Sequence, residues 1–105
     1  MTRRAACVLT RIRRLIRTKR WKLTGHALGD LADNLFERRD VESSILGGAI
    51  TKSEPDELGV ATDGLKHTIV GPSSANLPFV TTGKIVQGFD DIEYLVITAC
   101  ERSEQ

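Results

Sequence analysis

Apolar residues recur at helical spacing in the first part of the chain. One arc of a helical wheel holds Ala5, Val8, Leu9, Ile12, Leu15 and Ile16. Arginines occupy most of the remaining circumference, which is the pattern of an amphipathic helix that packs one face on a core. Lys19 would fall on the apolar arc, so the pattern predicts a helix over residues 5–17 that ends near Thr18.

Residues 24–46 resume the helical pattern after a break. Thr24 is a suitable N-cap, because its hydroxyl can accept a hydrogen bond from a backbone N–H that the first turn leaves without a partner. Asp40 either caps a further helix or lies inside one longer helix, and the sequence leaves both interpretations open. Gly47 and Gly48 predict the end of this helical region.

From residue 49 onward, short β-branched runs alternate with turn residues, which is typical of strands. The expected strands are Ala49–Lys52, Lys66–Val70, Pro78–Val86 and Ile92–Cys100. The last run is apolar on both faces in its middle and is therefore predicted to be a central strand. Pro78 has no N–H group and can only begin its strand, and Gly83 suggests a bulge.

Helices followed by strands predict a single α+β domain over residues 1–105. Two or three N-terminal helices are expected to pack on a four- to five-stranded, mainly antiparallel sheet. The helical regions are residues 5–17 and 24–46, and the sheet spans residues 49–101.

Two of the expected strands are predicted to lie at the edges of the sheet. A proline and the expected bulge blunt strand 78–86 as an edge, whereas strand 66–70 has no such protection. We therefore expect the edge at 66–70 to be covered by its own loop, by a second copy of the chain or by a strand of a partner protein.

The composition is that of an ordinary globular protein, with 40% hydrophobic and 28% charged residues. No apolar run reaches the roughly 18 residues of a transmembrane helix, so no membrane span is predicted. Cys7 and Cys100 lie near opposite ends without a CxxC motif, which predicts free thiols in a reducing, cytoplasmic compartment. Neither metal-site spacing nor a nucleotide-binding glycine motif is present, so no metal or cofactor is expected.

Positive charge is concentrated at the start of the chain. Residues 1–22 contain nine Lys and Arg and no acid, whereas residues 23–105 contain six bases and fourteen acids, a net charge of −8. The basic segment therefore either packs against the acidic remainder of the chain or binds an anionic partner, such as nucleic acid or another protein. A membrane-surface helix is the lesser alternative, because the apolar arc carries no aromatic residue.

Several short segments together resemble a known family. In order, they are Ile-Arg-Arg-Leu-Ile at 12–16, Leu-Thr-Gly-His-Ala at 23–27, Asp-Val-Glu at 40–42, Gly-Gly-Ala-Ile at 47–50 and Leu-Val-Ile-Thr-Ala at 95–99. This order resembles a widespread bacterial family of unknown function that is classed with the barnase/RelE-like small toxins and is often encoded beside YgiT-type zinc-finger antitoxins. The resemblance implies a RelE-like fold, an endoribonuclease activity without metal or cofactor, and an antitoxin as partner. Asp30 and Asn34 stand where the family pattern has arginines.

Metal-free RNA cleavage needs a base, an acid and a cation for the developing phosphorane charge. The candidate catalytic residues are His26, Lys66, His67 and Arg38. The candidate nucleic-acid-binding residues are Arg13, Arg17, Arg20, Arg39, Tyr94 and Thr98. Adjacent strand residues point to opposite faces, so Lys66 and His67 cannot line one groove, whereas Tyr94 and Thr98 are expected on one face. Each of these residues also has a purely structural interpretation, in the core or on a solvated surface.

Two functions from different classes follow. The first is a toxin-like RNA-binding protein or metal-free endoribonuclease that a cognate antitoxin restrains. The alternative is a catalytically inactive protein-binding module of the same fold, which Asp30 and Asp33 favour because carboxylates near His26 repel phosphate. The basic helix favours the first function. The expected partners are RNA, an antitoxin and a second copy of the chain paired through a sheet edge. A domain without a nucleic-acid role is a third interpretation.

Overall fold

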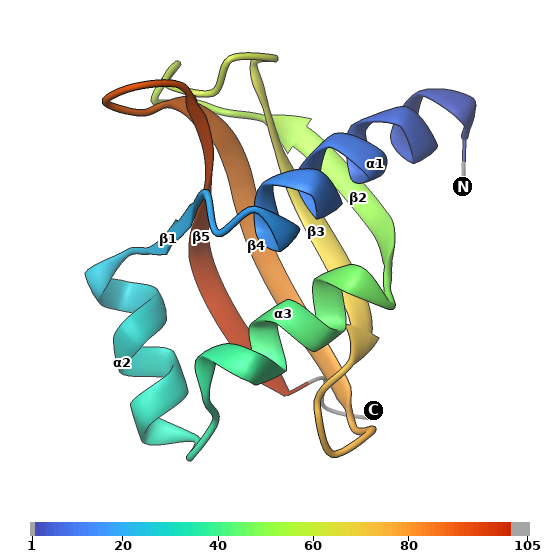
Figure 1. The fold of residues 1–105 in the computed structure, drawn as a ribbon, viewed down its shortest axis with the longest axis vertical. Coiled ribbons are helices and arrows are strands. Elements are labelled where there is room, and N and C mark those ends of the chain that lie inside the picture. Colours follow the sequence, from blue (N-terminus) through green and yellow to red (C-terminus); the bar gives the residue numbers. More distant parts are fainter. Residues whose placement is uncertain (1, 102–105) are drawn as a thin grey trace.

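The computed structural model describes residues 2–101 and places helices across one face of a twisted sheet (Figure 1). Its elements are α1 (Arg3–Arg17), β1 (Trp21–Leu23), α2 (Gly25–Asp33), α3 (Arg38–Leu46), β2 (Ala49–Pro55), β3 (Leu65–Pro72), β4 (Pro78–Gln87) and β5 (Ile92–Glu101). The α+β class with N-terminal helices is confirmed. Met1 and residues 102–105 of the expected domain lie outside the described residues.

The strands of the sheet follow the order β1-β5-β4-β3-β2. β1 runs parallel to β5, and the other neighbouring strands are antiparallel. The mainly antiparallel, five-stranded sheet is therefore confirmed, and β5 is interior as predicted. β1 was not expected, because three residues are too few to show a periodic pattern.

The edges of the sheet differ from the sequence expectation. β3 and β4 are both interior strands, and the edges are β1 and β2. The prediction that residues 66–70 and 78–86 form edge strands is therefore wrong, since β2 and β4 pair with the two sides of β3, and β3 and β5 with the two sides of β4. The side of β3 that was expected to need a loop, a second copy or a partner strand is covered by β2 of the same chain. Pro78 is the first residue of β4, so its missing N–H removes no hydrogen bond between the strands. The proline therefore does not mark β4 as an edge strand.

The core lies between the inner face of the sheet and the helices packed on it, of which α1 and α3 cross the strands (Figure 1). The helices contribute Leu9, Ile12, Leu15, Ile16, Ala27, Leu31, Val41 and Ile45, all buried. The strands contribute Trp21, Ile50, Ile69, Phe79, Ile85, Tyr94, Val96 and Ala99. The apolar arc read from the sequence is thus the surface by which α1 docks, and Thr18 caps its C-terminus as expected.

The region 24–46 forms two helices rather than one. Thr24 is the N-cap of α2 as predicted, because its hydroxyl accepts from the Ala27 N–H at 3.1 Å. Leu35 interrupts the helical path with a φ of 59°, in the left-handed region. α3 begins at Arg38, and Asp40 caps it from inside its first turn, where the carboxylate accepts from the Glu37 N–H at 2.8 Å.

A bulge in the β4–β5 ladder decides which residues point inward. Thr82 pairs with Thr98 and Gly83 with Val96, so Ile97 is the extra residue. A Cβ on Gly83 would lie 2.5 Å from the Tyr94 ring, which explains the glycine at this position. Because of the extra residue, Tyr94 and Thr98 face opposite sides of the sheet, and the expectation that they share a face is wrong.

Asp40 also links α3 to the turn between β3 and β4. Its Oδ1 accepts from the backbone N–H of Ser74 at 3.1 Å and from the Ser74 hydroxyl. Burial alone would raise the pKa of this carboxyl, but the hydrogen bonds from Ser74 and Glu37 outweigh burial, and the pKa lies below its usual value.

We expect the free energy of unfolding to fall as the pH decreases below about 4, because protonation of Asp40 then removes these hydrogen bonds. Because the pKa of Asp40 is lower in the folded protein, this stabilisation is complete at pH values above the pKa of Asp40 in the unfolded chain. It is lost as the pH falls through the lower pKa of the folded protein. Urea unfolding at pH values from about 2 to about 7 measures the effect. Asp40→Asn should be less stable at neutral pH and show a shallower acid slope. An unchanged slope would contradict the assignment.

Candidate nucleic-acid interface

The outward side of α1 is an arginine surface. Burial of the apolar arc leaves Arg3, Arg4, Arg11, Arg14 and Arg17 exposed, and we call these five residues the arginine face. None of them forms an ion pair or a side-chain hydrogen bond within residues 2–101. Guanidinium groups without carboxylate partners are available to an anionic ligand, and α1 itself contains no acid.

Two arginines from the predicted binding set have structural partners instead. Arg13 donates from Nη2 to the carbonyl of Gly48 at 2.7 Å and from Nε to that of Ile45 at 3.4 Å. The Ile45 carbonyl is one of the acceptors that the end of α3 leaves without a partner, and Gly48 follows the C-cap Gly47, so the two bonds tie α1 to the end of α3. Arg20 donates from Nε to the carbonyl of Ile92 at 3.2 Å. Of the predicted α1 arginines, Arg17 is the one that belongs to the arginine face.

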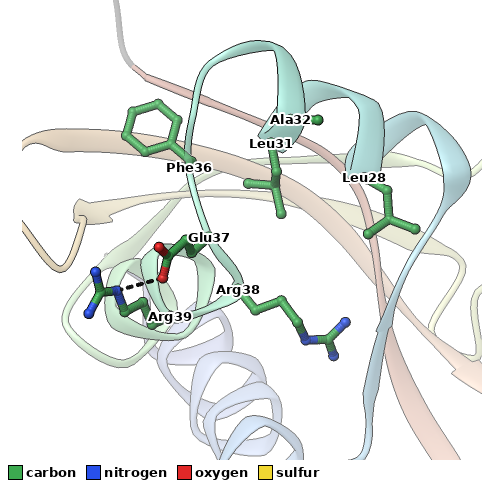
Figure 2. Close-up of a pocket in the computed structure, with 7 residues that line it drawn as sticks. All are labelled: Leu28, Leu31, Ala32, Phe36, Glu37, Arg38 and Arg39. Carbon is green, nitrogen blue, oxygen red and sulfur yellow. Dashed lines mark ion pairs between the residues drawn. The ribbon is translucent and has the colours of Figure 1, made fainter.

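Arg38 and Arg39 lie beside an apolar groove between α2 and α3, about 500 Å³ in volume and lined by Leu28, Leu31, Ala32 and Phe36. Figure 2 shows the two arginines extending in different directions from the start of α3. The Arg38 guanidinium lies 4.5 Å from the centroid of the Trp21 ring. Arg39 pairs with Glu37 at 2.9 Å, an exposed pair that leaves this part of the rim nearly neutral.

The four predicted catalytic residues are not gathered at one place. His26 is exposed on α2, with Nε2 3.5 Å from Asp30 Oδ2, and α2 packs on β1 and β5. Arg38 stacks on β1. Lys66 and His67 lie on opposite faces of β3, which is three strands from β1, or about 14 Å at the usual strand spacing. This arrangement gives no common site for a base, an acid and a cation.

His67 has two partners that the sequence analysis did not single out. Its ring is 1% exposed, Nδ1 lies 2.8 Å from Ser53 Oγ, and Nε2 lies 3.0 Å from Asp63 Oδ2. Ser53 is the cross-strand partner of His67 in the β2–β3 pair. The spacing of four residues between Asp63 and His67 could have indicated their contact from the sequence alone. The pairing of His67 with Ser53 could not be predicted in this way, because it depends on strand register.

The last two predicted nucleic-acid-binding residues lie in the sheet. Tyr94 is completely buried, and its hydroxyl has no hydrogen-bond partner among the described residues. Burial and the nearby Asp63 carboxylate raise the pKa of its phenol. A buried ring offers no face for a base to stack on. Thr98 is half-buried on the opposite face of the sheet, where it pairs with Thr82.

Within residues 2–101, no group of three or more His, Cys, Asp or Glu side chains is placed to hold a metal ion. No helix in this part of the chain is both long and apolar enough to cross a membrane. Comparison of the chain with models of protein families, with curated proteins and with solved structures finds no match. The chemistry of the described side chains is therefore the basis for a functional assignment.

The different roles of neighbouring arginines make a matched pair of variants. Arg13→Ala should lower the free energy of unfolding by about 1–3 kcal/mol, because it leaves two carbonyl groups without a donor. Arg14 is the next residue and is exposed, and Arg14→Ala should change the free energy of unfolding by less than about 0.5 kcal/mol. Urea unfolding measures both. Equal decreases in the two variants would show that Arg13 does not anchor α3.

Proposed function

We propose that the protein binds RNA through the arginine face of α1. The observation that carries the proposal is the display on one acid-free helix of five exposed arginines that have no ion-pair partner among residues 2–101. Guanidinium groups bind phosphate oxygens in bidentate geometry, and neutralised phosphates release counterions, which drives association. Such binding depends on salt and reads little sequence.

The charge of the remaining chain restricts where a polyanion can bind. Residues 23–105 carry a net charge of −8 and repel phosphate, so α1 is the favoured surface. The resemblance to small toxins supports RNA as the polyanion, and it favours a toxin–antitoxin pair in which a cognate antitoxin restrains this surface. We limit the proposal to binding, because His26 and Arg38 lie at the β1 side of the sheet and Lys66 and His67 do not.

Substitution of three arginines tests the proposal. Arg11, Arg14 and Arg17 change to Gln in one variant, and fluorescence anisotropy measures its binding to a single-stranded RNA oligonucleotide. The salt concentration varies from about 50 to about 300 mM, which brackets the physiological value of about 150 mM. The slope of log affinity against log salt should decrease by roughly 0.7 for each phosphate that is no longer neutralised, about 2 in total.

A control variant carries the same change in charge. Lys19, Lys22 and Lys52 each pair with a glutamate and lie outside the arginine face, and their triple change to Gln should leave most of the slope. Equal loss of affinity in both variants would show that net charge alone determines binding. Absence of RNA binding by the unaltered chain would contradict the proposal.

A second candidate function is recognition of a protein helix by the groove between α2 and α3. Leu28 is 50% exposed there, and Leu35, in the turn that joins the helices, is 92% exposed. Apolar residues that remain in water beside a groove mark a site for an apolar partner surface. Arg38 at the rim, which pairs with no carboxylate among residues 2–101, favours a partner whose apolar stripe is bordered by acids.

We expect a designed helical peptide with leucines at i, i+3, i+4 and i+7 and flanking glutamates to shift the NMR signals of the groove. Leu28→Asp should weaken this binding at least about tenfold, because it places a carboxylate in the apolar site. Leu58→Asp is the control, since Leu58 is 80% exposed in the β2–β3 loop, away from the groove. Equal weakening by both substitutions would exclude the groove as the site.

A further inference from the structure

Ser53, His67 and Asp63 form a continuous hydrogen-bonded chain at the side of the sheet where β2 pairs with β3. Ser53 and His67 are directly opposite each other in the antiparallel ladder, which places both side chains on the same face. Ser53 Oγ lies 2.8 Å from His67 Nδ1, and His67 Nε2 lies 3.0 Å from Asp63 Oδ2. This is a nucleophile, a base and an orienting carboxylate in order.

The surroundings of His67 fix its hydrogen-bonding roles. Asp63 is held by the Leu65 N–H, which donates to Oδ1 at 3.0 Å, so Oδ2 faces the imidazole. A carboxylate only accepts, and the ring therefore donates its Nε2–H to Asp63. The lone pair of Nδ1 then faces the Ser53 hydroxyl and can take its proton. The two ring nitrogens have exchanged roles relative to serine proteases, but either nitrogen can act as the base.

The serine is accessible, whereas the histidine is not. Ser53 is exposed and lines a cavity of about 220 Å³ together with Thr2, Arg4, Ala5, Val8, Leu65 and His67. His67 is 1% exposed, so bulk water does not compete for its hydrogen bonds. A substrate in the cavity would meet the Ser53 hydroxyl first. The apolar side chains of the wall leave room for a short acyl group.

The same cavity contains groups that suit a developing negative charge. Arg4 contributes a guanidinium to the wall. The cavity also lies at the N-terminus of α1, where Thr2 accepts from the N–H groups of Ala5 and Ala6. The N–H groups of Arg3 and Arg4 precede that of Ala6, the first to donate to a carbonyl of the helix, and are therefore left without an intrahelical acceptor. Donors and a cation near a nucleophile stabilise an oxyanion.

We propose that Ser53, His67 and Asp63 form a catalytic site that hydrolyses carboxylic esters with short acyl chains. Ser53 Oγ bonds to the carbonyl carbon while His67 Nδ1 takes the hydroxyl proton. The tetrahedral oxyanion collapses, the bond to the alcohol oxygen breaks, and His67 returns the proton to that oxygen. Water then attacks the acyl-serine, His67 accepts a proton from it, and the proton returns to Ser53 as the carboxylic acid leaves. The proposed hydrolysis does not require bound RNA.

A covalent probe tests the nucleophile directly. An alkyl fluorophosphonate should phosphonylate Ser53, with loss of fluoride, and mass spectrometry of peptides should place the adduct on that residue. Ser53→Ala should remove the adduct, and Thr51→Ala should not, although Thr51 is an exposed hydroxyl on the same strand. Asp63→Asn should slow labelling, because an amide can donate to the ring and reverse its hydrogen bonding. Absence of an adduct on Ser53 would overturn the proposal.

Turnover supplies a second, independent measurement. Hydrolysis of p-nitrophenyl acetate should decrease about 10²–10⁴-fold in Ser53→Ala and in His67→Gln, the usual contribution of such groups. Ser53 lies on an exposed edge strand, so its variant remains informative even where removal of the buried His67 unfolds the protein. Equal rates in the unaltered chain, Ser53→Ala and Thr51→Ala would overturn the proposal and leave the three residues as a structural link between β2 and β3. RNA binding should be the same in all of these variants.

Discussion

The rest of the structure depends on the docking of one apolar arc of α1 against the sheet. Leu9, Ile12, Leu15 and Ile16 are almost completely buried, and each such side chain contributes about 1.5–3 kcal/mol. Their sum, on the order of 6–12 kcal/mol, is comparable with the net stability of a small domain. The same contact fixes the rotation of the helix about its axis. The arginine face is therefore turned to solvent as a direct consequence of core formation.

The docking of α1 also determines which side chains lie together at the β2 edge of the sheet. α1 crosses the strands with its N-terminus beside β2, so Arg4 approaches the cross-strand pair of Ser53 and His67 (Figure 1). The cavity at this place combines residues from α1, β2 and β3. The arginine face, proposed to bind RNA, and the proposed ester-hydrolysing site thus lie on two sides of one helix, and Arg4 belongs to both.

A buried ion pair holds the loop that supplies the third member of the hydrogen-bonded chain. Asp56 accepts from the N–H groups of Val60 and Ala61 and from Lys84 Nζ at 3.1 Å, and both side chains of the ion pair are about 95% buried. The Ala61 N–H in particular keeps the pKa of Asp56 below its usual value, against the effect of burial. Because the loop is tied to β4 in this way, Asp63 is placed against His67 rather than in solvent.

The sequence by itself determined the features that depend on local periodicity: the span of α1, the cap at Thr24, the interior position of β5 and the division between a basic helix and an acidic remainder. Only the tertiary structure decided the order of the strands, the parallel pairing of β1, and the separation of Arg13 from the arginine face. It also decided the partnership of Ser53 with His67. The physical reason is that a periodic pattern reports which face of an element is buried, whereas hydrogen-bond partners distant in the chain are selected by strand register and by a single extra residue in a ladder.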